Sequence, residues 1–247
     1  MNGWTSRDQD LIHALGSYGI LSTPQIRQLL FQNNRKTTML RRLRILEKRR
    51  LIRRTTGLPG GGFAWYLPPE VGEKAGFEGI PMHINRNSLE HDVFLSQVRI
   101  ALNSIGVGDS WTNEFALRRR AWEQQKGQYA IQEAIPDAIL TVDHNGLKVL
   151  ALELELWGKS RRRYEKIFAG YNGKRQLWRI LYLVPHKELG KLISEVKAKV
   201  AWKTNEIPVM WGIIEDILKH PKQALLHLAD QSSTLERIIN IPESKAS

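Results

Sequence analysis

The chain has 247 residues, of which 42% are hydrophobic and 25% charged, and it carries a formal net charge of +12. Such a composition is typical of one large or two small globular domains. The absence of cysteine excludes disulfides and thiolate metal sites. The polar start MNGWTSRDQD carries no signal peptide, and no apolar run reaches the roughly eighteen residues that a membrane span needs. We therefore expect a cytoplasmic protein without a membrane partner.

The positive charge is concentrated near the N-terminus. Residues 1–60 contain 12 Lys and Arg against 3 Asp and Glu, which is a surplus of 9 out of the total of +12. Charge asymmetry of this kind indicates binding to nucleic acid or to another anionic surface.

The N-terminal region predicts three helices followed by two short strands. Apolar periodicity predicts a helix over Trp4–Tyr18 and another that starts with Thr23 as N-cap and Pro24 in its first turn. The third helix, over residues 37–49, has Leu40, Leu43 and Leu46 on its inner face. Strands over residues 51–55 and 63–67 flank a glycine-rich tip at residues 57–62.

This order of elements resembles a winged helix-turn-helix, which implies that the third helix enters the major groove of double-stranded DNA and that the wing meets phosphate. We therefore predict a DNA-binding domain over residues 1–69, followed by a linker over 70–87. The predicted DNA-binding residues are the cations of the third helix and its flanks: Arg35, Lys36, Arg41, Arg42, Arg44, Lys48, Arg49, Arg53 and Arg54.

The predicted second domain covers residues 88–230 and leaves a polar tail at 231–247. It begins with a helix over residues 88–103, whose first turn contains Glu90 and whose apolar face includes His91, a residue that we expect to be a hydrogen-bonded core histidine. The remaining predicted elements are a strand at 111–117 with an exposed stretch to 132, a β-hairpin at 135–156, a helix at 160–171, a strand at 178–184, a helix at 187–202, a strand at 207–213 and a helix at 215–228.

Three carboxylates interrupt the otherwise core-like hairpin IPDAILTVDHNGLKVLALELEL: Asp137, Glu153 and Glu155. A three-residue loop with Gly146 at positive φ would place Asp137 opposite Glu153, with Glu155 on the same face. A two-residue Asn-Gly loop would separate the acids unless a bulge intervened. Because buried acids need partners and hard cations prefer oxygen ligands, the first register predicts a divalent metal site.

Pro136-Asp137, a spacer of fifteen residues and Glu153-Leu154-Glu155 resemble the PD-(D/E)XK nuclease motif, with Glu155 in place of the usual lysine. The predicted order of helix, three strands, helix and strand is also that of this fold. The expected fold class is thus α/β (α+β), a winged helix-turn-helix followed by a restriction-endonuclease-like mixed-sheet domain. With the N-terminal region, the chain resembles the replication-relaxation family, which includes MobC-type mobilization relaxases.

The resemblance implies metal-dependent, site- and strand-specific nicking of DNA at a transfer or replication origin of a plasmid or mobile element. Asp137 and Glu153, with Glu90 from the preceding helix, would hold Mg²⁺ or Mn²⁺. Glu155 would accept a proton or join the metal-facing acids. The cation that stabilises the transition state would be Lys166, with Arg162 as second choice. Other mobilization or relaxosome proteins are expected partners.

Two alternatives stay open at this point. One is a catalytically inactive DNA-binding accessory factor or transcriptional regulator, which the missing motif lysine favours. The other concerns the nucleophile, because Tyr164 and Tyr171 follow the acids closely. Their seven-residue spacing on one helix face favours core packing, and we therefore predict hydrolytic nicking that leaves free ends.

Overall fold

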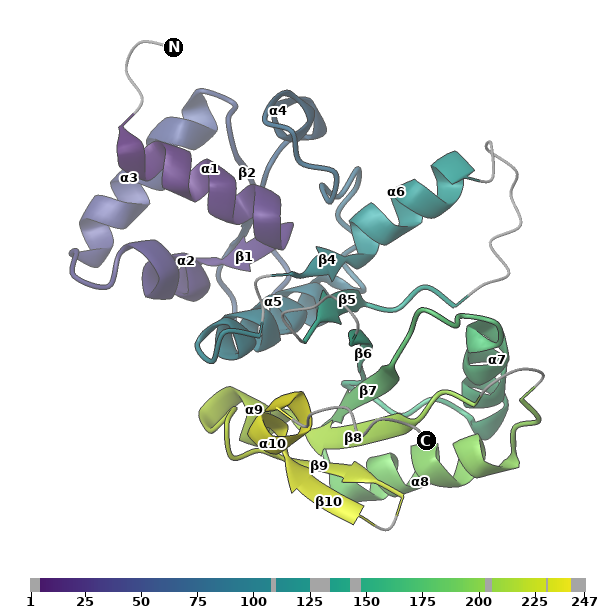
Figure 1. Cartoon of the computed structure of the whole chain (residues 1–247). Coiled ribbons are helices and arrows are strands. Elements are labelled where there is room, and N and C mark those ends of the chain that lie inside the picture. Colours follow the sequence, from purple (N-terminus) through teal and green to yellow (C-terminus); the bar gives the residue numbers. More distant parts are fainter. Residues whose placement is uncertain are drawn as a thin grey trace. The chain divides into compact units, whose positions relative to one another are not determined.

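The computed structural model describes residues 5–107, 110–124, 134–142, 148–202, 206–229 and 231–240. It is a mixed α/β structure that divides into two compact units (Figure 1), Met1–Gln97 with Asn113–Gln124, and Val98–Thr112 with Gln125–Ser247. The first unit therefore continues past residue 69, where we predicted a domain boundary, and it contains the predicted linker. None of the described helices is long and apolar enough to cross a membrane.

The first unit is built from helices around a small antiparallel sheet. Its order is α1 (Ser6–Tyr18), β1 (Ile20–Ser22), α2 (Thr23–Leu30), α3 (Lys36–Lys48), β2 (Arg53–Thr55), β3 (Ala64–Tyr66) and α4 (Pro69–Lys74). The sheet has the order β1-β3-β2, so the central strand is the last one in sequence. The predicted strand–loop–strand after the third helix is confirmed, with a shorter β2 than expected.

Two helix starts of the first unit are set by reciprocal side-chain caps. The Thr5 hydroxyl accepts the Asp8 backbone N–H, while the Asp8 carboxylate accepts the Thr5 backbone N–H. Ser22 and Gln25 form the same box before α2. Our prediction of Thr23 as the N-cap is therefore wrong by one residue, because the hydroxyl of Ser22 is the one that reaches the third backbone N–H of the helix.

Helix α5 (Leu89–Asn103) matches the predicted helix at residues 88–103. The next prediction is wrong: β4 contains only Thr112–Asn113, and α6 (Glu114–Gln124) replaces the rest of the strand and the start of the exposed stretch. The Asn113 side chain accepts the Ala116 backbone N–H at 3.0 Å and thus caps α6. An N-cap residue followed by an acid in the first turn is a helix signal that the sequence analysis missed.

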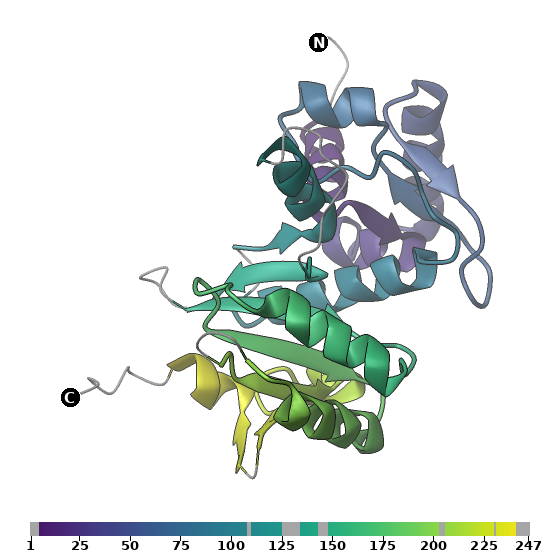
Figure 2. The same cartoon turned by 90° about the vertical axis from the view of Figure 1, so that its right-hand side faces the viewer.

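The second unit contains most of a seven-stranded mixed sheet with the order β10-β9-β8-β7-β6-β5-β4. β5 (Ala138–Thr141) and β6 (Val149–Leu154) are antiparallel, and β6 is parallel to β7 (Arg179–Val184), which is parallel to β8 (Val209–Ile213). The crossovers are α7 (Arg161–Tyr171) and α8 (Lys187–Lys199). Figure 2 shows these two helices side by side against the sheet.

The core of this unit lies between the sheet and the two crossover helices. Helix α7 contributes Tyr164 and Phe168, α8 contributes Ile193, and β7 contributes Ile180 and Tyr182, all of which are fully buried. The polar faces of both helices remain in solvent, as their amphipathic sequences predict.

The C-terminal region differs from the predicted long helix and polar tail. α9 ends at Lys219 (Ile214–Lys219), and β9 (Leu225–Leu228), β10 (Gln231–Thr234) and α10 (Leu235–Asn240) follow. Pro221 explains the early end, because the residue before a proline avoids the α conformation and His220 has φ −140° and ψ 61°. The sequence therefore carried the stop signal that our longer helix ignored.

Candidate functional site

The β5–β6 hairpin has the register that brings the acids together. Ala138 pairs with Leu152, and Thr141 pairs with Val149, so that one step outward places Asp137 opposite Glu153. The predicted three-residue register is confirmed, although the turn itself, with Gly146, lies outside the described residues. Ile139 and Ala151 pack into the core beneath α7 and α8, and side chains two positions away point to the same face. Asp137, Glu153 and Glu155 therefore share that face.

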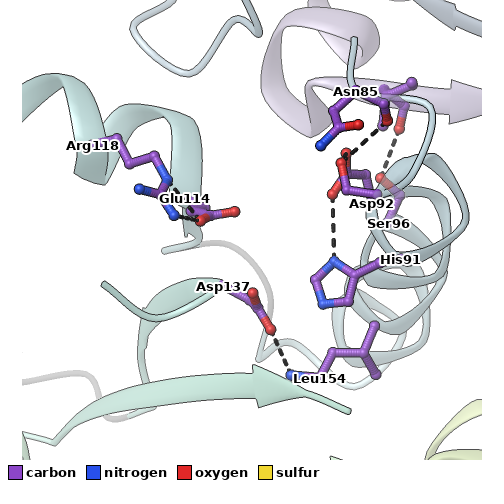
Figure 3. A network of polar contacts seen from close by, with 10 residues as sticks. Asn85, His91, Asp92, Ser96, Glu114, Arg118, Asp137 and Leu154 are labelled. Atoms are coloured by element: carbon purple, nitrogen blue, oxygen red, sulfur yellow. Dashed lines mark hydrogen bonds and ion pairs between the residues drawn. The ribbon is translucent and has the colours of Figure 1, made fainter. Parts of the chain in front are cut away.

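Asp137 directly precedes β5, and its side chain continues the hydrogen bonding between β5 and β6. Its Oδ2 accepts the backbone N–H of Leu154 at 2.7 Å (Figure 3). This bond holds the carboxylate beside the end of β6, where Glu153 and Glu155 emerge. The residue is only partly buried.

Glu153 is the most perturbed acid of the group. It is 9% exposed, and its Oε1 accepts a hydrogen bond from the Tyr171 hydroxyl of α7. Burial raises the pKa of Glu153 well above its usual range, and the charges of Asp137 and Glu155 raise it further. The Tyr171 hydrogen bond and the charge of Lys159 act in the opposite direction. The carboxyl thus retains its proton to a higher pH until a positive charge compensates the cluster.

Glu155 is 2% exposed and forms an ion pair with Lys159, a residue of the loop between β6 and α7. The backbone of Lys159 is also fixed, because its N–H donates to the Tyr164 hydroxyl at 3.1 Å. Ser160 then caps α7 by accepting the Arg163 N–H. A loop cation therefore lies beside the acids, four residues after the position where the motif would carry its lysine.

Tyr182 of β7 is the neighbour of Glu153 in the parallel ladder. Its side chain is fully buried, and its hydroxyl has no hydrogen-bond partner among the described residues. Burial, followed by the charges of Glu153 and Glu155, raises the Tyr182 pKa well above its usual range. A buried hydroxyl without a partner costs about 1–3 kcal/mol, which makes a polar group bound beside these acids favourable.

The predicted cations of α7 lie elsewhere. Lys166 and Arg162 are both exposed on the helix, whereas the residues that face the acids from α7 are Tyr164 and Tyr171. The cation that contacts an acid of the cluster in the structure is Lys159, which the sequence analysis did not select. An i, i+4 acid–base spacing is a recognised signal only within a helix, and Lys159 lies in a loop.

Core packing, which we preferred for the two tyrosines, is what the structure shows. Tyr164 and Tyr171 are each 0% exposed. Burial raises the pKa of Tyr164 to about 12 and that of Tyr171 well above its usual range, so both phenols stay protonated. The contact of Tyr171 with Glu153 was not foreseen, because it joins two elements that are separate in sequence.

Glu90 and His91 belong to the first unit, at the start of α5. The Ser88 hydroxyl donates to Asp92 Oδ2 at 3.2 Å. His91 Nδ1 lies 3.4 Å from Asp92 Oδ1 (Figure 3). The prediction of a hydrogen-bonded histidine is consistent with this contact. Glu90 is partly buried, and its role as a metal ligand stays a prediction.

The described residues contain no group of three or more histidine or acidic side chains arranged to hold a metal ion. Two facing carboxylates nevertheless fit Mg²⁺, which is commonly bound through one or two carboxylates, several waters and substrate phosphate. Asp137 and Glu153 supply such a pair, and their mutual repulsion would be relieved by a cation. The donor set therefore suits a hard divalent ion, whereas Glu155 is already paired with Lys159.

The basic helix α3 has an exposed cationic face. Its members and the flanking cations that are exposed are Arg35, Lys36, Arg41, Arg44, Lys48 and Arg49. Arg42 differs: its guanidinium forms a two-bond ion pair with Asp8, which is 0% exposed. This contact ties α3 to α1 and pairs the Arg42 charge inside the unit, while the assignment of Arg42 to the DNA-binding face stays a prediction.

The two arginines of β2 are exposed but paired. Arg53 binds Glu70 at 3.1 Å, and Arg54 binds Glu47 at 3.0 Å while its guanidinium stacks 4.5 Å from the ring centroid of Phe63. Exposed ion pairs contribute little to stability, so both arginines can exchange their partners for phosphate.

An open cavity of about 950 Å³ lies in the first unit beside this basic face. It is bordered by α2, the N-terminal part of α3, the loop at residues 58–63 and the start of α5. Arg27 and Lys36 line it together with apolar side chains such as Met39 and Phe63. The cationic helix and the glycine-rich loop therefore border a common hollow.

Comparisons with known proteins add no identification. No protein-family model matches the chain, and neither the curated proteins nor the solved structures contain a match.

Proposed function

We propose that this protein is a DNA-binding, metal-dependent endonuclease that nicks one strand at a transfer or replication origin of a plasmid or mobile element. The observation that carries the proposal is the hairpin register, which sets Asp137 opposite Glu153 with Glu155 and Lys159 next to them. Two carboxylates and a cation at the end of a strand are the groups that hydrolysis of a phosphodiester requires.

The first unit supports the DNA-binding part of the proposal. Its order of α1, β1, α2, α3, β2 and β3, with the sheet order β1-β3-β2, agrees with a winged helix-turn-helix. We propose that α3 enters the major groove through Arg41 and Arg44 and that the loop at residues 56–63 lies along the phosphates. Arg41 and Arg44 are exposed and form no ion pair with another described residue, so phosphate contacts would replace only solvent.

The second unit supports the nuclease part. Along the chain, α5, β4, β5, β6, α7 and β7 follow the order of the PD-(D/E)XK core, interrupted by α6. Asp137 and Glu153 would hold Mg²⁺ or Mn²⁺, which when bound supplies an activated water and neutralises phosphate charge. Tyr171 keeps the Glu153 carboxylate in a fixed orientation through its hydroxyl, and Glu155 holds Lys159 beside the other acids.

We assign the cationic role to Lys159 in place of Lys166. Lys159 is 38% exposed at its side chain, so the ammonium contacts both the buried Glu155 and the solvent from which DNA would approach. Lys166 is exposed on α7 and suits a phosphate contact. The Glu155–Lys159 pair would thus together take the place of the single lysine of the motif.

Incubation of the full chain with supercoiled DNA of its own element and Mn²⁺ tests the proposal. We expect conversion to the open-circular form, with loss of cutting in Asp137→Ala and Glu153→Ala. Lys159→Ala should lose most cutting, Lys159→Arg should retain part of it, and Lys166→Ala should cut normally. Wild-type protein that binds this DNA without nicking it, at any Mn²⁺ or Mg²⁺ concentration, would refute the nuclease assignment.

A catalytically inactive accessory factor is the second candidate. The observation that favours it is that the acids are satisfied within the protein, through Leu154, Tyr171 and Lys159. In that case the second unit would contact other mobilization or relaxosome proteins in the cytoplasm. This candidate would be supported over the enzyme if the protein binds DNA equally with and without metal and if Glu153→Ala still binds a mobilization or relaxosome protein.

A further inference from the structure

The loop between β6 and α7 exposes a large aromatic side chain at an unusual place. Trp157 is 60% exposed, although tryptophan is highly buried on average and Trp65 and Trp211 of this chain are 2% and 5% exposed. It lies two residues after the buried Glu155 and two before Lys159.

The loop that carries Trp157 is held at both ends. Lys159 is paired with Glu155 and donates its backbone N–H to Tyr164, and Ser160 caps α7. The indole is therefore presented on a short segment between fixed points. A preorganised aromatic group loses little conformational entropy when a ligand stacks on it.

Several cations follow the indole closely in sequence. Lys159 is followed by Arg161, Arg162 and Arg163, all of which are exposed. Arg161 is paired with Glu195 at 2.8 Å, whereas Arg162 and Arg163 form no ion pair with any other described residue. An exposed indole beside unpaired arginines is the combination that binds single-stranded nucleic acid, in which bases stack on aromatics and phosphates meet cations.

We propose that the segment from Trp157 to Arg163 is a binding site for an unpaired DNA strand, with one base stacked on Trp157 and its phosphates on Arg162 and Arg163. The inference rests on the proposed function for the identity of this strand as the one to be cut. Trp157 is two residues from both Glu155 and Lys159 in the sequence. A strand of a locally opened duplex held at Trp157 would therefore present its phosphodiester backbone to the acids. The substrate of the second unit would then be unpaired DNA, while the first unit holds the duplex.

The test measures binding of a short fluorescein-labelled oligo(dT) to the full chain in EDTA, by anisotropy, so that no cutting is needed. Trp157→Ala should weaken binding about five- to 150-fold, the equivalent of about 1–3 kcal/mol for one stacked base. Trp157→Phe should retain most of the affinity, because a phenyl ring also stacks. Trp122→Ala, which removes another exposed tryptophan (43% exposed) in the first unit, is the matched control and should bind normally.

The arginines are tested by salt dependence. Arg162→Ala combined with Arg163→Ala should lower the slope of log K against log salt by about 1.4, or about 0.7 for each phosphate contact on a single strand. Binding to a DNA duplex should change little in Trp157→Ala but fall in Arg44→Ala.

Equal oligo(dT) affinities of wild type and Trp157→Ala would overturn the inference. The inference would also be overturned if the wild-type protein self-associates while Trp157→Ala sediments as a monomer with unchanged oligo(dT) binding, because the indole would then mediate self-association. The outcome is separate from that of the nicking assay. A protein that never cuts but whose oligo(dT) binding depends on Trp157 would refute the nuclease proposal and leave the strand-binding site intact.

Discussion

Glu153→Gln should make the stability of the second unit less dependent on pH. The wild-type carboxyl is buried beside Asp137, and this raises its folded-state pKa above the ordinary value of 4.5. The folded protein therefore holds a proton that the unfolded chain has already released. Its contribution to stability is fully present below about pH 4.5 and is lost as the pH rises through the folded-state pKa. The glutamine amide has the same shape and cannot lose a proton in this range.

The size of the effect follows from proton linkage. One proton held by the folded state alone changes the free energy of unfolding by about 1.4 kcal/mol per pH unit. Near pH 4 the free energy of unfolding of the variant should equal that of wild type within about 0.5 kcal/mol. With each further pH unit the variant should gain up to about 1.4 kcal/mol over wild type, and this difference should level off above the folded-state pKa of Glu153. Two pH units of separation would thus give about 2.7 kcal/mol.

Hydrogen exchange of the β6 and α7 amides measures the free energy of opening of this unit by itself. Comparison of both proteins at the same pH cancels the intrinsic exchange rates. Glu165→Gln, which changes an exposed acid of α7, is the control, and its free energy of opening should equal that of wild type at every pH. A difference between Glu153→Gln and wild type that stays constant from pH 4 to 8 would refute the argument, because Glu153 would then ionise as it does in the unfolded chain.

Three further predictions follow from the same contacts. Mn²⁺ should raise the melting temperature of the wild-type protein by mass action, and an equal rise in Asp137→Ala would count against a metal at that acid. Arg42→Ala should lower the free energy of unfolding of the first unit by about 3–5 kcal/mol, because it leaves the buried Asp8 carboxylate without its cation. Arg41→Ala should change this free energy by less than about 0.5 kcal/mol and should weaken duplex binding by about 1–3 kcal/mol. Urea denaturation and DNA titration of both variants would show the reverse pattern if Arg42 faced DNA. Tyr171→Phe should still nick DNA without a protein-linked strand, although more slowly because Glu153 loses its hydrogen bond. A covalent adduct that survives SDS and heat in wild type and disappears in this variant would instead make Tyr171 the nucleophile.

Much of the hairpin could be predicted because its information is local. Alternating apolar residues set the faces of β5 and β6, and a register that places three acids together is chemically distinct from one that separates them. The early end of α9 and the cap of α6 are also encoded locally, in Pro221 and Asn113.

The partners of the charged side chains could not be predicted in the same way. Nothing near Arg42 in sequence indicates that Asp8 is buried beside it, since the pair joins α3 to α1 across 34 residues. Tyr171 likewise reaches Glu153 only because the crossover helix α7 packs on the sheet. A basic helix therefore predicts an exposed cationic face as a whole, while the packing decides which of its arginines points inward.

The sequence by itself determined the local features of this protein: the amphipathic faces of its helices, the register of the acidic hairpin and the concentration of positive charge on α3. These depend on the period of the backbone and on short-range turn chemistry, which act within a few residues. Only the tertiary structure decided that Lys159 meets Glu155, that Tyr171 holds Glu153 and that Trp157 stays in solvent. Such contacts depend on how separate elements pack, because burial and charge pairing are settled by neighbours that are distant along the chain.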